Sequence, residues 1–313
     1  MNNINAQKSY PHLYLEITRK CNLFCPHCFN NSIRESSLNM SLTDVKKVLN
    51  NFVTAGGRSL QITGGEVFMR DDIFAILKYA RKIGIQYIIL STNGTICTNE
   101  QIDDICKYAD EVYLSIDGFE KDNDLIRGKG SFKKTYNTLV ELGKRQQKIS
   151  VYTSLTPKVL NYLEEFINWL IEKNVYFLNI SPIGNVGRGS YISDEMIFDK
   201  TEYLHLYKKL TKIKRKYFEK IKISHPLTTN PRKFDLAMED WICNPKGQLG
   251  LLIGGDVSDK WILGNAKKNF QFNTSKLQNY VKIMDDIIYE FEMSSKNDVI
   301  HMWEAMVEKL INE

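Results

Sequence analysis

The sequence has no long apolar segment and no strong excess of one charge. No run among the 313 residues approaches the length of a membrane span, and Met1 to Lys8 lack the apolar core of a signal peptide. The formal net charge of +5 is small for this length and far from that of a nucleic-acid-binding protein. We therefore expect a cytoplasmic protein that has neither a membrane nor a nucleic acid as a partner.

Cysteine is scarce and unevenly placed. Of the six cysteines, Cys21, Cys25 and Cys28 lie together, and none follows Cys243. No second pair stands at zinc-ribbon spacing, which disfavours a closed four-ligand zinc site. In a chain of this size without a secretion signal, such a group favours a metal centre over disulfides. One short loop can wrap three thiolates around a soft metal centre, and a four-iron cluster held in this way keeps one iron for another ligand. Three unrelated thiols are the alternative.

Apolar segments alternate with helical patterns along most of the chain. The β-branched and apolar runs predict strands at 13–17, 59–63, 86–91, 111–116, 149–154 and 176–181. The 3.6-residue periodicity predicts helices at about 41–53, 71–83, 99–108, 131–146 and 160–173. Regular alternation of this kind predicts the α/β class, with a parallel sheet and right-handed crossovers.

Unusual residues follow several of these strands. Gly64-Gly65-Glu66 follows the second strand, Thr92-Asn93-Gly94 follows the third, and Ser115 and Asp117 end the fourth. The ends of parallel strands meet at one edge of the sheet, which is where ligands bind in α/β barrels. Two glycines remove both Cβ atoms, so this backbone could approach a small ligand closely. The alternative is a tight turn followed by a solvated glutamate.

The motif Cys21-x-x-x-Cys25-x-x-Cys28 after the first strand resembles the radical S-adenosylmethionine (radical SAM) superfamily. The resemblance implies a partial (β/α)6 TIM-like barrel and one [4Fe-4S] cluster, held by the three cysteines, whose open iron chelates S-adenosylmethionine. The family usually has an aromatic residue where this chain has His27, and a proline where it has Val67. The resemblance further implies cofactor contacts by Gly64, Gly65, Glu66, Thr92, Asn93, Ser115, Asp117 and Arg127.

Residues 241–265 resemble the start of a SPASM or Twitch domain, in which cysteines bind auxiliary iron–sulfur clusters. Two short strands flank Gly254-Gly255-Asp256, which is a hairpin signal. Cys243 stands alone here, and Lys260 occupies about the position of the next ligand. We therefore predict a degenerate domain without an auxiliary cluster. Cys243 is then a buried structural thiol, a hydrogen-atom donor to a substrate radical, or a vestige.

The predicted division of the chain follows from these patterns. It comprises an N-terminal tail (1–12), a radical SAM partial barrel (13–225), a hairpin region (226–265) and a helical C-terminal extension (266–313). Cys97 and Cys106 are predicted to be core thiols. Gly187-Arg188-Gly189 either passes close to a ligand or is a plain flexible connection. The basic amphipathic helix at about 204–217 presents either a solvated face or a docking surface for an acidic partner.

The resemblance implies an enzyme that cleaves S-adenosylmethionine with one electron, from a flavodoxin or a ferredoxin. A 5′-deoxyadenosyl radical then abstracts hydrogen from the substrate. Because relatives with SPASM-like tails mostly modify peptides, we expect a ribosomally made peptide that is cross-linked, epimerised or otherwise functionalised at a C–H bond. The alternatives are a small-molecule enzyme of a cofactor or sugar pathway, and a non-catalytic iron–sulfur or zinc-binding module.

Overall fold

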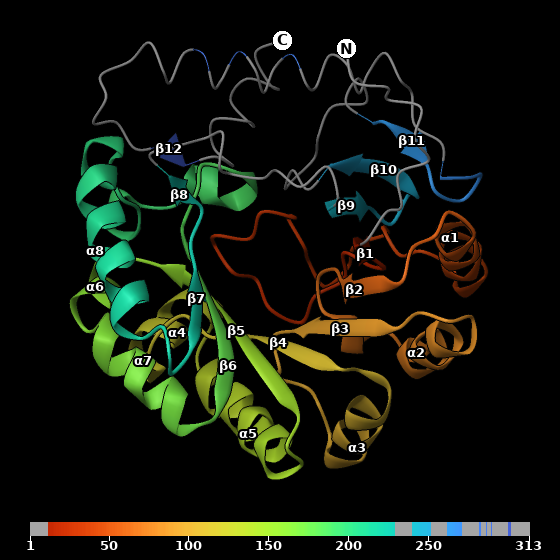
Figure 1. The fold of residues 1–313 in the computed structure, drawn as a ribbon, viewed down its shortest axis with the longest axis horizontal. Helices are drawn as coiled ribbons and strands as arrows, with labels where there is room; N and C mark the ends of the chain where they lie inside the picture. The colour runs from red at the N-terminus through yellow and green to blue at the C-terminus, as the bar shows by residue number, and fades with distance from the viewer. Residues whose placement is uncertain are drawn as a thin grey trace.

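The computed structural model describes residues 12–228, 240–251 and 262–270, with the single positions 282, 286, 289, 300 and 301. Its main sheet has ten strands in the order β11-β10-β9-β1-β2-β3-β4-β5-β6-β7 (Figure 1). The strands are β1 His12–Glu16, β2 Ser59–Thr63, β3 Tyr87–Thr92, β4 Glu111–Ser115, β5 Lys148–Leu155, β6 Val175–Pro182, β7 Lys222–Ser224, β9 Asp240–Cys243, β10 Gln248–Leu251 and β11 Gly264–Asn265. A separate antiparallel pair joins β8 Leu227–Thr228 to β12 Ile300–His301.

The helices lie on the outer side of the curved sheet (Figure 1). They are α1 Leu42–Thr54, α2 Ile73–Lys82, α3 Asn99–Tyr108, α4 Glu120–Arg127, α5 Ser131–Lys144, α6 Pro157–Asn161, α7 Leu163–Glu172 and α8 Tyr203–Lys216. Short 3-10 turns occupy Val67–Met69 (η1), Gly187–Tyr191 (η2), Asp194–Met196 (η3) and Lys200–Glu202 (η4). The strands from β1 to β7 are parallel to their neighbours, and the described strands form an open sheet. The expected partial barrel of α/β class is confirmed.

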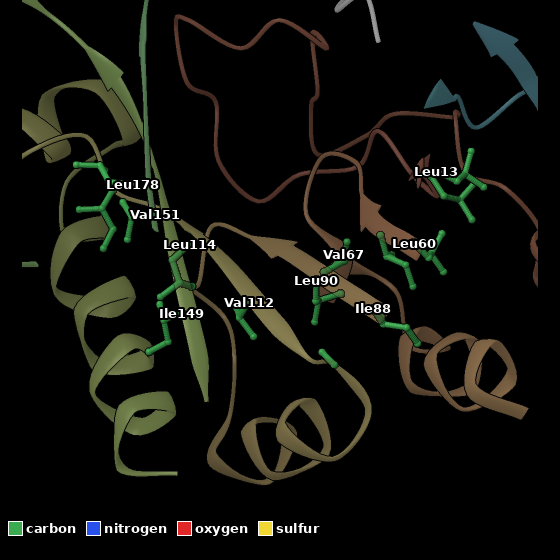
Figure 2. Close-up of a cluster of buried hydrophobic side chains, with 14 of the residues drawn as sticks. Leu13, Leu60, Val67, Ile88, Leu90, Val112, Leu114, Ile149, Val151 and Leu178 are labelled. Carbon is green, nitrogen blue, oxygen red and sulfur yellow. The ribbon is translucent and has the colours of Figure 1, made fainter. Parts of the chain in front are cut away.

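The hydrophobic core lies between the sheet and the outer helices. Alternate strand residues such as Leu60, Leu90, Val112 and Val151 point into it and are fully buried (Figure 2). Because successive side chains of a strand point to opposite faces, their neighbours lie on the concave face. That face carries polar and aromatic side chains, including Gln61, Ser91, Tyr113, Tyr152 and Phe177. The alternation thus places apolar side chains on the face that the helices cover and polar and aromatic side chains on the concave face.

Two helices of the barrel differ from the sequence-based expectation. The helix predicted at 160–173 is broken at Tyr162, whose φ of −122° and ψ of 21° end α6 before α7 begins. The hydroxyl of Tyr162 donates to Asp122 on α4, 2.6 Å away, and α4 itself was not predicted. The residue at the break thus contacts a helix that lies 40 positions earlier in the sequence.

The C-terminal region adds strands to the main sheet. β10 and β11 pair antiparallel, as the hairpin signal predicts, although the Gly-Gly-Asp turn lies outside the described residues. β9, which the sequence did not predict, pairs parallel with β1 and antiparallel with β10. The sheet therefore continues past residue 225, and the division into domains stays a prediction. Almost all of the predicted helical extension lies outside the described residues. No described helix has the length and apolar character needed to cross a membrane.

Candidate functional site

The three cysteines lie in the loop between β1 and α1 (residues 17–41), which we call the cysteine loop. This loop lies on the concave side of the sheet (Figure 1). Cys21 and Cys25 are 9% and 8% exposed, and Cys28 is half-buried. Backbone hydrogen bonds close the base of this cysteine loop. The amide of Cys21 donates to the Ile33 carbonyl at 3.1 Å, and the amide of Ile33 donates to the Arg19 carbonyl at 3.2 Å. The thiols are therefore presented by a loop of defined shape.

The electrostatics of the thiols indicate what this loop could bind. Burial, together with the charges of Glu66, Cys25 and Cys28, raises the pKa of Cys21 to about 12, although the hydrogen bond from the Leu23 amide opposes the rise. Burial also raises the pKa of Cys25. A cationic centre would stabilise thiolates in this position. Among the described residues, no three His, Cys, Asp or Glu side chains stand in the arrangement of a single-ion site. Three cysteines of one short loop are a donor set that fits a four-iron cluster with one iron left for another ligand.

Gly64 and Gly65 make room for the chain that leads into the cysteine loop. A Cβ atom on Gly64 would lie 2.3 Å from the Thr18 carbonyl oxygen, and one on Gly65 would lie 2.3 Å from that of Lys20. The backbone amide of Gly65 donates to the Thr18 carbonyl at 2.8 Å, and the backbone amide of Glu66 donates to the Lys20 carbonyl at 2.8 Å. We expected these glycines to admit a ligand, but in this structure they admit protein backbone. A contact with the cofactor from this segment stays a prediction.

Glu66 joins the loops that follow β2 and β3. Its carboxylate is fully buried and accepts hydrogen bonds from Thr92 Oγ1 at 2.7 Å, from the Asn93 amide at 2.7 Å and from the Phe68 amide at 3.1 Å. Burial raises the pKa of Glu66, and these hydrogen bonds oppose the rise. The solvated glutamate considered above is therefore ruled out, and the side chain supports the site from within.

Asn93 connects the loop after β3 to the cysteine loop. Its side-chain amide donates to Asn22 Oδ1 at 2.9 Å and to Cys21 Sγ at 3.9 Å. Asn22 in turn donates to Thr95 Oγ1 at 2.8 Å. Thr135 on α5 donates to the Asn93 carbonyl at 2.7 Å. No sequence signal points to Asn22 or Thr135, because isolated asparagines and threonines have many ordinary uses.

Asp117 and Arg127 form a buried ion pair next to the cysteine loop. Arg127 Nε lies 2.7 Å from Asp117 Oδ2, and Asp117 Oδ1 accepts from the Ser154 amide at 2.7 Å. His27 Nε2 lies 3.7 Å from the same Oδ2 atom, and burial lowers the pKa of His27 to about 4. Arg127 ends α4 and is therefore not the solvated loop charge that it suggests in isolation. The two charges compensate each other, and Arg127 Nη2 donates to Asp117 Oδ1 at 3.2 Å, but Arg127 Nε and Asp117 Oδ2 have no hydrogen-bond partner among the described residues. Cofactor contacts by Asp117 and Arg127 stay predictions. So does a contact by Ser115, which lies half-buried at the end of β4.

Comparison with known proteins identifies this arrangement. The model of the Radical SAM superfamily matches residues 15–170, a span that contains the three cysteines, Gly-Gly-Glu and Thr-Asn-Gly. The chain belongs to the radical SAM superfamily. This superfamily uses a [4Fe-4S] cluster and S-adenosylmethionine, and Cys21, Cys25 and Cys28 are the residues here that would hold the cluster.

Several relatives of this radical SAM chain are known. Pre-heme d1 synthase of Dinoroseobacter shibae is 28% identical over 183 residues, covering 58% of this chain and 45% of the relative. Mycofactocin maturase MftC of Mycolicibacterium smegmatis is 31% identical over 189 residues, covering 58% and 46%. The chain thus spans about half the length of these relatives. The structure of native anSMEcpe with bound AdoMet and Cp18Cys peptide matches with a TM-score of 0.69 at 18% identity, covering 87% of this chain and 82% of that one. This likeness shows a shared fold.

Cys243 of the radical SAM chain is the last residue of β9, beside β1. It pairs in register with Leu15, is fully buried and belongs to the same hydrophobic core as Leu13 and Leu15. Burial raises the pKa of its thiol above the normal range. This position favours the structural-thiol alternative over the hydrogen-donor alternative.

Replacing Cys243 with alanine is therefore expected to leave the iron content unchanged. The loss of a buried thiol should lower the free energy of unfolding by about 1 kcal/mol, as for a typical core substitution. Iron analysis after anaerobic reconstitution and denaturant unfolding measure the two effects. A fall in iron per chain would show instead that Cys243 binds metal.

Gly65→Ala is expected to disturb the cysteine loop through its backbone. The new Cβ would meet the Lys20 carbonyl oxygen, which is backbone and cannot rotate away. We expect a loss of about 1–3 kcal/mol in denaturant unfolding, together with less iron per chain. Gly143→Ala on α5 is the control, because its Cβ would meet no atom within 4 Å. That change should be neutral or stabilise by up to about 1 kcal/mol. Equal behaviour of the two variants would contradict the packing described here.

Proposed function

We propose that this protein is an enzyme that cleaves S-adenosylmethionine at one [4Fe-4S] cluster and abstracts hydrogen from a ribosomally made peptide. The supporting observation is that segments that follow other strands form hydrogen bonds with the cysteine loop. Gly65 and Glu66 hydrogen-bond its incoming backbone, and Asn93 holds Asn22 beside Cys21. When bound, the cluster and S-adenosylmethionine supply one-electron chemistry that no protein side chain provides. The residues of the chain supply shape, fixed thiol positions and partial exclusion of water.

Each residue of the site has a specific role in this proposal. Cys21, Cys25 and Cys28 would hold the cluster, and the burial of the first two keeps solvent from their sulfurs. Glu66 fixes the loops after β2 and β3 relative to each other, so that the edge where S-adenosylmethionine would bind is formed in advance. Asp117 and Arg127 place a neutralised pair beside His27 on the cysteine loop.

A peptide is the proposed substrate class. The chain resembles a mycofactocin maturase in sequence, and its fold resembles that of anSMEcpe, whose structure contains a bound peptide. The similarity to pre-heme d1 synthase favours a second candidate, a small-molecule substrate of a cofactor pathway. Both candidates need a one-electron donor of the flavodoxin or ferredoxin type. We propose a cytoplasmic location, where such donors are present.

Iron and sulfide analysis after anaerobic reconstitution, combined with a dithionite assay for 5′-deoxyadenosine, tests the chemistry. About four irons per chain with release of 5′-deoxyadenosine would support a single cluster. Zinc in place of iron, or a four-iron protein that never releases 5′-deoxyadenosine, would favour the binding-module alternative. Deuterium carried from a labelled candidate peptide into 5′-deoxyadenosine would support the peptide substrate. Transfer only from a labelled small molecule would favour the second candidate.

A further inference from the structure

Arg188 contacts the cysteine loop from a segment that follows a distant strand of the same sheet. It lies in η2, the next element after β6, whereas the cysteine loop follows β1. β6 and β1 lie on opposite arms of the curved sheet (Figure 1). The Arg188 amide donates to the Cys28 carbonyl at 3.0 Å, and Nε donates to the Cys25 carbonyl at 2.9 Å. Nη1 donates to the Ser32 carbonyl at 2.9 Å. One residue thus satisfies three carbonyls of the loop, two of which belong to proposed cluster ligands.

The neighbouring glycine explains how the backbone comes so close. Gly187 has a φ of +59°, and a Cβ atom there would lie 2.4 Å from the Phe29 carbonyl oxygen and 2.6 Å from that of Cys28. Only glycine allows this contact without displacing backbone. The Gly-Arg-Gly segment is therefore neither a flexible connection nor open space for a ligand, the two alternatives raised by the sequence. Its backbone packs directly against the backbone of the cysteine loop.

The chemistry of the contact requires arginine. The planar guanidinium donates from Nε and Nη1 in a fixed fork, which can reach the carbonyls of Cys25 and Ser32 together. The guanidinium also lies over the Phe24 ring, with its carbon 4.2 Å from the ring centroid. Phe24 stands between the first two cysteines and is 69% exposed, so the contact occurs at the surface end of the loop. A lysine could keep the positive charge over the ring, but it has no fork with which to bridge the two carbonyls.

We propose that Arg188 is a positioning residue that sets the cysteine loop in its cluster-binding shape before the cluster arrives. The proposal rests on the proposed function only in that Cys21, Cys25 and Cys28 receive a cluster. Neighbouring thiols do not attract one another, so hydrogen bonds must hold the loop, and Arg188 adds three from outside to the backbone hydrogen bonds within it. Arg188 binds the loop at both ends of the segment from Cys25 to Ser32 and so limits its opening.

The experiment compares R188K and R188Q with wild type and with R34Q. Arg34 lies exposed on the same loop and is the matched control. Amide exchange is measured over residues 21–33 in the cluster-free protein, and the rate of anaerobic cluster assembly is followed by absorbance. We expect faster exchange in that segment and assembly slowed about tenfold in both Arg188 variants, because the paired side-chain hydrogen bonds to the Cys25 and Ser32 carbonyls are lost. R34Q should match wild type in both measurements.

Each outcome decides the proposal. Wild-type exchange and assembly in both Arg188 variants would overturn it. Recovery of wild-type behaviour by R188K alone would also overturn it, because charge rather than the fork would then position the loop. If the Arg188 variants do not fold, Gly187→Ala tests the same contact from the backbone, and normal assembly in that variant would overturn the proposal. If wild-type protein takes up no iron, the proposed function fails, and exchange in the cluster-free protein still tests the role of Arg188.

Discussion

We expect that replacing Cys25 with alanine abolishes assembly of the cluster. Cys25 is the middle thiol of the three and is 8% exposed, so no solvent-borne ligand can easily take its place. The two remaining thiolates, Cys21 and Cys28, would leave a second iron without a protein ligand. The iron content and the charge-transfer absorbance of the reconstituted protein should therefore fall to background, and 5′-deoxyadenosine should not form.

Cys106→Ala provides the control for this experiment. Cys106 lies on α3, half-buried against the hydrophobic core, and far along the chain from the cysteine loop. Its removal should leave iron and absorbance at the wild-type values, which separates the loss of a ligand from the loss of any cysteine. An intact cluster spectrum in Cys25→Ala would refute the assignment of the three ligands.

Replacing Arg127 with alanine should cost about 3–5 kcal/mol of folding free energy, because it leaves the buried Asp117 carboxylate without its counter-charge. The two side chains are 10% and 0% exposed. Burial by itself would lower the pKa of Arg127, but Asp117 and Cys25 raise it, so the guanidinium stays charged. Denaturant unfolding of the cluster-free protein measures the loss.

The exposed pair of Arg145 and Asp103 is the matched control for Arg127. Its side chains are 26% and 68% exposed, so Arg145→Ala should cost about 1 kcal/mol or less. The double variant Asp117→Asn, Arg127→Gln should recover part of the stability, because it removes both charges together. A loss in Arg127→Ala as small as that in Arg145→Ala would mean that Asp117 finds another partner or becomes protonated.

The sequence by itself determined the repeating units and the position of the cysteine loop. Alternating hydrophobicity over residues such as Leu60 and Ile62 is a local property, and it selects strand and buried face without reference to the rest of the chain. The spacing of Cys21, Cys25 and Cys28 is local too, because one loop carries all three. That Gly-Gly-Glu and Thr-Asn-Gly share an edge follows from parallel strand order alone.

Only the tertiary structure decided what these residues contact. Glu66 is buried by Thr92 and Asn93, and Arg188 contacts Cys25 from 163 positions away. The placement of β9 beside β1 puts Cys243 in the core, although nothing near Cys243 in the sequence indicates this pairing. Hydrogen bonds and ion pairs act over a few ångströms, so their partners are fixed by how the chain returns on itself. Local patterns determine which strands and loops form, and the packing of distant segments decides which side chains support the site.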